Sequence, residues 1–94
     1  MTAEEIVLNI AVNMGRLSRW STSGRVDRIK QFLNDTQVYL DNLEKIQVSN
    51  KFMPTMQRFK KDLVILKNLD YTTYEWAENT LTWANILQHR AKLA

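Results

Sequence analysis

Apolar residues recur every three or four positions along almost the whole chain, and no stretch of useful length alternates in the way that a β-strand does. This spacing places the apolar side chains on one side of an α-helix. The chain also contains only two glycines and one proline among its 94 residues. That is too few turn-forming residues for a β-sandwich or a barrel. The sequence therefore predicts an all-α protein.

Interruptions in the spacing divide the chain into four predicted helices. We expect these helices at residues 3–19, 24–47, 54–68 and 72–92. The segment Trp20–Gly24 is expected to break the first helix from the second, and Pro54 suits the first turn of the third. Short connections between amphipathic helices favour antiparallel neighbours. We therefore expect a single domain over residues 1–94, folded as an antiparallel up-down four-helix bundle.

Local signals mark two helix starts and one helix contact. Thr2 with Glu5, and Thr72 with Glu75, have the spacing of a capping box, in which each side chain binds the other's free backbone amide. In the fourth helix small residues recur at every seventh position, at Ala77, Ala84 and Ala91. Small residues at this spacing allow a neighbouring helix to approach closely.

The predicted helices carry more apolar surface than they can bury by packing against one another. The first helix is apolar nearly all round, so it is either central in the bundle or in contact with another chain. The predicted second and fourth helices outrun the other two by roughly four to six residues. The apolar residues expected at these overhanging ends are Tyr39, Leu43, Ile46, Leu87 and Leu93. Uncovered apolar surface of this kind favours association, and we expect a homodimer.

The net charge of +3 is too small to name a partner, but the charged residues are unevenly distributed. Residues 16–30 hold five basic residues against Asp27, a local charge of +4. The acidic residues of the segment 68–84, which lies at the same end of an up-down bundle, are Asp70, Glu75 and Glu78. The two segments can neutralise each other, or the basic end can bind an external anion.

This basic end, around Trp20, is the candidate partner-binding site. Positive charge at the start of the second helix opposes the helix dipole, and an acidic partner would relieve that repulsion. Trp20 can stack on a guanidinium or lie exposed at an interface. The residues of this candidate site are Arg16, Arg19, Trp20, Arg25 and Arg28. A second basic face is expected on the third helix, at Arg58, Lys60, Lys61 and Lys67.

The residue inventory argues against an enzyme. The chain has no cysteine and one histidine, His89, so it lacks a thiolate nucleophile, a thiolate metal site and any site that needs two histidines. It also lacks a glycine-rich phosphate loop and the Glu-x-x-His pairs of di-metal bundles. We expect no catalytic residues, no cofactor and no metal.

These features predict a small non-enzymatic interaction or adaptor module that recognises a protein partner. The alternative is a helical protein that binds an anion or nucleic acid through the basic segments 16–30 and 58–67. The chain starts with acidic residues rather than the basic start of a signal peptide. No apolar run approaches the roughly 20 residues of a membrane span. We therefore expect a cytoplasmic protein.

Overall fold

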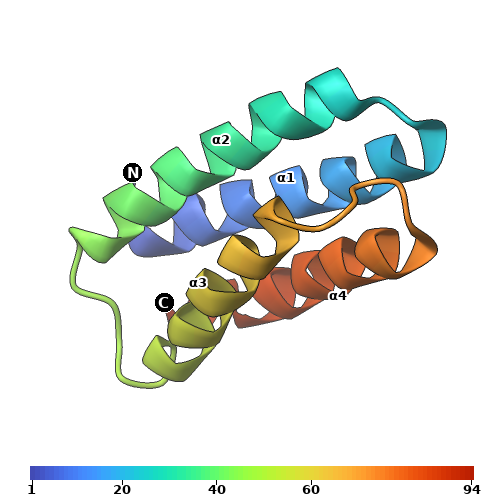
Figure 1. The fold of residues 1–94 in the computed structure, drawn as a ribbon. Coiled ribbons are helices and arrows are strands. Elements are labelled where there is room, and N and C mark those ends of the chain that lie inside the picture. Colours follow the sequence, from blue (N-terminus) through green and yellow to red (C-terminus); the bar gives the residue numbers. More distant parts are fainter.

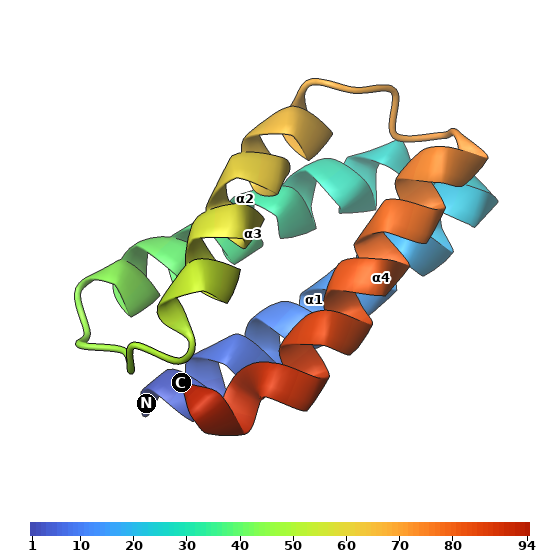
Figure 2. The ribbon, with the colours of Figure 1, turned by 90° about the horizontal axis from the view of Figure 1, so that it is seen from below.

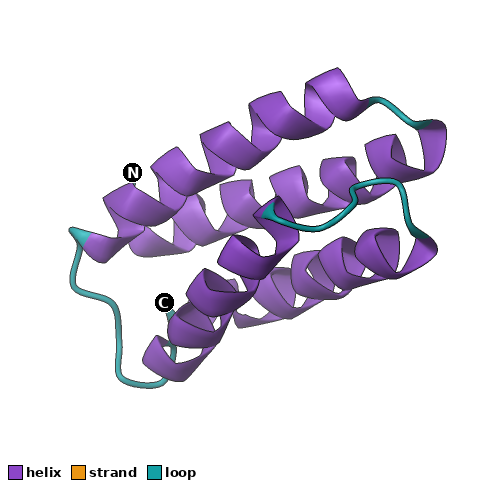
Figure 3. Ribbon diagram, viewed as in Figure 1, coloured by secondary structure: helices purple, strands orange, loops and turns teal.

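The structure, a computed structural model, describes all 94 residues as four α-helices and a short 3₁₀ turn, without strands (Figures 1 and 3). The elements are α1 (Ala3–Ser23), α2 (Val26–Glu44), α3 (Met53–Lys67), α4 (Tyr74–Arg90) and η1 (Ala91–Leu93). The predicted all-α four-helix class is confirmed. None of the helices combines the length and the apolar character that a membrane-crossing segment requires.

The first helix continues past Arg19 to Ser23, so the predicted break over Trp20–Gly24 is wrong for all but its last residue. The hydroxyls of Thr22 and Ser23 bind carbonyls of the last turn of α1, as Thr22 does to the Arg19 carbonyl at 2.8 Å. The helix ends at Gly24, whose φ of 71° is a left-handed conformation that glycine adopts without the steric cost of a Cβ. The backbone amide of Gly24 donates to a carbonyl of the last turn. Gly24 and Arg25 therefore separate α1 from α2.

One of the two predicted capping boxes is present. Thr2 and Glu5 bind each other's backbone amides at 3.1 and 3.0 Å, which confirms the start of α1. The capping box predicted for Thr72 and Glu75 is wrong. Thr73 caps α4 instead, by accepting the backbone N–H three residues further on at 3.1 Å.

The overhanging apolar ends that the sequence predicted are not present. The four helices have 21, 19, 15 and 17 residues, so the first is the longest. Leu43 and Leu87 are each only 2% exposed. The connection between α2 and α3 folds over this end, because it buries Val48 and Phe52, and its Ser49 amide donates to the last backbone carbonyl of the chain at 3.2 Å. Of the five apolar residues predicted at these ends, only Ile46 is exposed, at 37%.

In the bundle α1 lies between α2 and α4, and α3 crosses on the other side of these two helices (Figures 1 and 2). Contacts run in opposite order along α1 and α4. Ser18 donates to the carbonyl of Ala77 at 2.8 Å, and Ser21, further along α1, donates to that of Tyr71, which precedes α4, at 2.5 Å. These two helices are therefore antiparallel.

Small residues hold α1 and α4 close together. A Cβ placed on Gly15 would lie 3.9 Å from the Cβ of Ala84, an ordinary van der Waals contact. The three alanines of the predicted column, Ala77, Ala84 and Ala91, are all buried. The close helix approach that the sequence predicted is confirmed.

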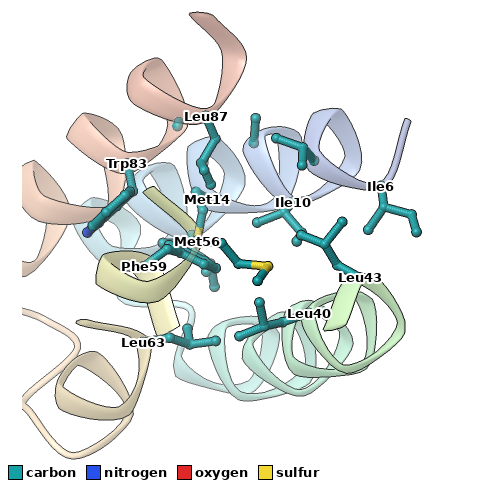
Figure 4. Close-up of a cluster of buried hydrophobic side chains, with 14 of the residues drawn as sticks. Ile6, Ile10, Met14, Leu40, Leu43, Met56, Phe59, Leu63, Trp83 and Leu87 are labelled. Carbon is teal, nitrogen blue, oxygen red and sulfur yellow. The ribbon is translucent and has the colours of Figure 1, made fainter. Parts of the chain in front are cut away.

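Large side chains fill the other side of the core. The rings of Phe59 in α3 and Trp83 in α4 meet edge to face with centroids 5.2 Å apart. The indole N–H of Trp76 donates to the carbonyl of Leu66 at 2.9 Å. Figure 4 shows side chains of all four helices converging on one cluster, among them Ile10, Met14, Leu40, Met56, Leu63 and Leu87.

Candidate interaction face

Three of the predicted partner-binding residues meet on the side of the molecule shared by α1 and α2. The ring of Trp20 packs against that of Phe32 with centroids 4.7 Å apart. The guanidinium of Arg28 lies 5.6 Å from the centroid of Trp20, and that of Arg16 lies 5.8 Å from the centroid of Phe32. A cation over an aromatic face is attracted by the electrons of the ring. Trp20 therefore stacks on a guanidinium, as one of the two expectations had it, and Phe32 is a member of this cluster that the sequence did not single out.

The other two residues of the predicted site lie elsewhere. Arg19 lines a hollow between α1 and α4. Arg25 precedes the first turn of α2, where its Nε lies 3.5 Å from a carboxylate oxygen of Asp27. The five residues are thus not one cluster.

The basic end is not neutralised by the acidic segment 68–84. The structure contains two ion pairs, Arg25 with Asp27 and Lys60 with Glu44, and neither joins the two segments. The carboxylate of Asp70 instead accepts the hydroxyl and the amide of Thr72 at 2.6 and 2.9 Å, and these hydrogen bonds lower the pKa of Asp70.

The residues of the predicted second basic face point in different directions. Lys60 faces α2, where its Nζ lies 2.8 Å from Glu44, and Lys67 donates to Gln37 of the same helix. Arg58 lines a hollow between α3 and α4. Lys61 is exposed without an ion pair.

The exposed side of α1 is a feature that the sequence indicated only in part. Five exposed residues at helical spacing form this outer stripe: Glu5, Leu8, Val12, Arg16 and Arg19. At its middle, Leu8 and Val12 are 39% and 52% exposed. The sequence predicted that this helix is apolar nearly all round and either central or in contact with another chain, but it did not single out Leu8 and Val12 as the exposed residues. The outer stripe is acidic at its start, apolar in the middle and basic at its end.

Two hollows run along either side of the outer stripe, and Val12 lines both. The hollow toward α2 has a volume of about 440 Å³, and exposed Val38 extends the apolar surface across it. The hollow toward α4 has a volume of about 360 Å³ and is lined by Leu8, Gly15 and Leu81. A ridge with a groove on each side is the shape by which helices pack against one another.

The hollow toward α2 also has a polar lining. Asn13 is almost fully buried, yet its carboxamide has no hydrogen-bond partner within the chain. Asp35 and Arg16 line the same hollow without forming an ion pair. These groups can donate to and accept from the polar groups of an occupant.

The remaining candidate residues do not assemble a second kind of site. His89 is exposed on α4, where its Nδ1 lies 2.8 Å from the carbonyl of Asn85. No three acidic or histidine side chains lie together in a metal-binding arrangement. Comparisons of the chain with models of protein families, with curated proteins and with solved structures find no match.

Proposed function

We propose that this chain is a protein–protein interaction module and that it forms a homodimer by packing the outer stripe of α1 against the outer stripe of a second copy. The observation that supports this function is the exposed ridge of Leu8 and Val12 with a hollow on each side. Burial of this ridge in the grooves of another helix would remove apolar surface from water, the main favourable term in association. The expected cytoplasmic location stays a prediction.

The charges of α1 argue for a second copy as the occupant. Glu5 lies seven residues before Val12, and Arg19 lies seven residues after it. In a two-fold antiparallel pairing centred on Val12, each Glu5 faces Arg19 of the other copy, because the same surface meets itself in reverse order. A parallel pairing would oppose like charges. Opposite charges around an apolar centre favour the antiparallel register.

The residues between the centre and the ends also suit this register. Leu8 lies four residues before Val12 and Arg16 four residues after it, so each Leu8 meets Arg16 of the other copy. The methylene stem of an arginine can cover an apolar side chain while its charged head stays in water. Arg16 is already positioned by its contact with Phe32, so less side-chain freedom is lost on association.

The oligomeric state of a matched pair of variants tests this function. Val12→Glu places a charge at the centre of the ridge, whereas Val64→Glu places the same charge on an equally exposed position of α3. Sedimentation velocity should show a concentration-dependent dimer for the wild type and for Val64→Glu. The dissociation constant of Val12→Glu should rise by about 100-fold or more, because an unpaired charge would be buried.

Circular dichroism should show the same helix content in all three proteins, since both positions face solvent. The proposal would be contradicted by a wild type that stays monomeric up to concentrations of about 100 µM. Association that weak would fall below what a specific interface of standard size gives. A dimer that Val12→Glu leaves intact would contradict it as well.

A further inference from the structure

A third hollow lies between the start of α3 and the end of α4, away from the outer stripe of α1. Its volume is about 270 Å³, and it is lined by Pro54, Thr55, Arg58, Trp83, Ile86 and Arg90. Since a water molecule occupies about 30 Å³, the hollow has room for a small anion and several waters. The proposed dimer does not use this hollow, and of its lining residues only Trp83 belongs to the buried core.

The first turn of α3 has one uncompensated backbone donor, because the amides of Met53 and Met56 bind the carbonyls of Ser49 and Phe52. The residue before the helix provides no side-chain cap, and the first turn contains no acidic residue. Pro54 has no N–H, and the amide of Thr55 has no hydrogen-bond partner in the chain. The free amides and the dipole of a helix N-terminus attract negative charge.

The side chain of Thr55 is a second, independent indication. Thr55 is only 7% exposed, and its hydroxyl forms no hydrogen bond within the chain. Because every fully enclosed side-chain nitrogen and oxygen has a partner, the Thr55 hydroxyl is not fully enclosed, and Thr55 lines this hollow. A buried hydroxyl without a partner is costly unless water or a ligand satisfies it.

Two arginines without an ion pair line the same hollow from different helices. Neither Arg58 nor Arg90 takes part in an ion pair. The acidic residue nearest in sequence on α3 is Asp62, one helical turn after Arg58, and one of its carboxylate oxygens accepts the indole N–H of Trp83 at 3.0 Å. The lining therefore offers a net positive charge and many donors.

We propose that this hollow binds a phosphate group. The two guanidinium forks, the Thr55 hydroxyl and the Thr55 amide supply more donors than the two oxygens of a carboxylate can accept, whereas the oxygens of a phosphate can accept them all. The ligand class is thus a tetrahedral oxyanion, either free phosphate or a phosphate monoester. This site is independent of the proposed homodimer.

Titration of the full chain with inorganic phosphate, followed by ¹H–¹⁵N NMR, tests the site. The amide of Thr55 and the Nε–H signals of Arg58 and Arg90 should shift and saturate. A parallel titration with chloride at matched ionic strength should leave these signals in place. Equal shifts in phosphate and chloride would show screening alone and would overturn the proposal.

Three variants and a matched control locate the binding. Arg58→Gln, Arg90→Gln and Thr55→Val should each weaken phosphate binding, the arginine variants by about tenfold or more. Lys61→Gln removes the same charge from α3 outside the hollow, so the affinity should change by less than about twofold. Thr55→Val keeps the shape of the side chain, and its spectrum reports whether the fold is intact. Arginine variants that bind as tightly as Lys61→Gln would overturn the proposal.

A comparison of two ligands identifies the source of the phosphate. O-phosphoserine that binds more tightly than inorganic phosphate would assign the hollow to phosphate monoesters. Equal affinity, with the same dependence on Arg58 and Arg90, would assign it to free phosphate. Failure of both ligands to saturate the Thr55 signal would exclude the site and leave the dimer untouched.

Discussion

Helices α1 and α3 both leave aliphatic side chains in solvent, but the surroundings of those side chains differ. On α3, Val64 is 56% exposed and lies between Lys60 and Lys67 at helical spacing. No hollow is lined by Val64. On α1, Val12 lines two hollows and has an acidic residue before it and basic residues after it.

The difference shows that exposure alone does not identify an interface. Single exposed aliphatic residues are normal on the surface of soluble proteins. Two copies of the α3 face would bring lysines against lysines, whereas two antiparallel copies of α1 would bring Glu5 against Arg19. A surface that binds a second copy of itself must be self-complementary in shape and in charge when the second copy runs in the opposite direction.

The buried sides of the two helices differ in the size of their side chains. α3 meets its neighbours through large side chains such as Phe59 and Leu63, whereas α1 meets α4 through small ones such as Gly15 and Ala84. Replacement of a large side chain of α3 by a small one should therefore lower the stability most. At the contact between α1 and α4, which we call the seam, replacement of a small side chain by a large one should lower it.

Leu63→Ala should cause the largest loss of stability. Leu63 is fully buried in α3, and removal of a buried leucine side chain costs about 2–5 kcal/mol through lost burial and a cavity. Urea unfolding at a fixed protein concentration measures this loss. Ile65→Ala, an exposed position on the same helix, should change the free energy of unfolding by only about 0.5 kcal/mol. Equal losses would mean that α3 is not held by its large residues.

Ala84→Leu should cost about 1–3 kcal/mol, because the added methyl groups force apart helices that small residues keep close. Gly15→Ala is the matched test of the same seam. A Cβ at Gly15 would meet Ala84 at an ordinary 3.9 Å, so this change should raise stability by up to about 1 kcal/mol through better helix propensity. The same unfolding assay applies to both variants. A stable Ala84→Leu would show that the seam is looser than these contacts indicate.

Reversal of the charges on α1 should have a smaller effect, confined to association. Arg19→Glu should raise the dissociation constant of the dimer by about tenfold, since two symmetric rim pairs of up to about 1 kcal/mol each would be lost. Glu5→Arg with Arg19→Glu should restore most of the affinity, as measured by sedimentation.

The control for this charge swap is Glu5→Gln, which keeps an acceptor for the capping box and removes only the charge. Its dimer should be weakened less than that of Arg19→Glu, because the ion pairs are lost without a new repulsion, and the helix content should change little. A dimer that neither single change weakens would refute the antiparallel register. It would not contradict the proposal that the chain is an interaction module.

The sequence predicted several parts of the fold that depend on local chemistry, although it placed the cap of α4 one residue too early. The capping box of Thr2 and Glu5 and the contact at Ala84 follow from spacing alone. The end of α1 was missed because Ser21 binds the carbonyl of Tyr71, a residue fifty positions away that spacing does not reveal.

The candidate interaction face needed the structure for a similar reason. A helix that is apolar nearly all round has no preferred buried side until its neighbours are known, so spacing alone could not single out Leu8 and Val12 as exposed. The overhanging ends were wrongly predicted because burial of Phe52 depends on how the connection folds back over them. The aromatic contact of Trp20 with Phe32 could have been found only by aligning α1 with α2.

A disulfide cross-link at Val12 tests the α1 homodimer most directly. The chain has no cysteine, so Val12→Cys introduces a single thiol. Helices that pack 8–10 Å apart bring facing Cα atoms to roughly 5 Å at a two-fold axis, within the range of a disulfide. Mild oxidation of Val12→Cys at micromolar concentration should give a covalent dimer, and Val64→Cys should form no covalent cross-link. A cross-link at Val64 and none at Val12 would contradict the α1 interface.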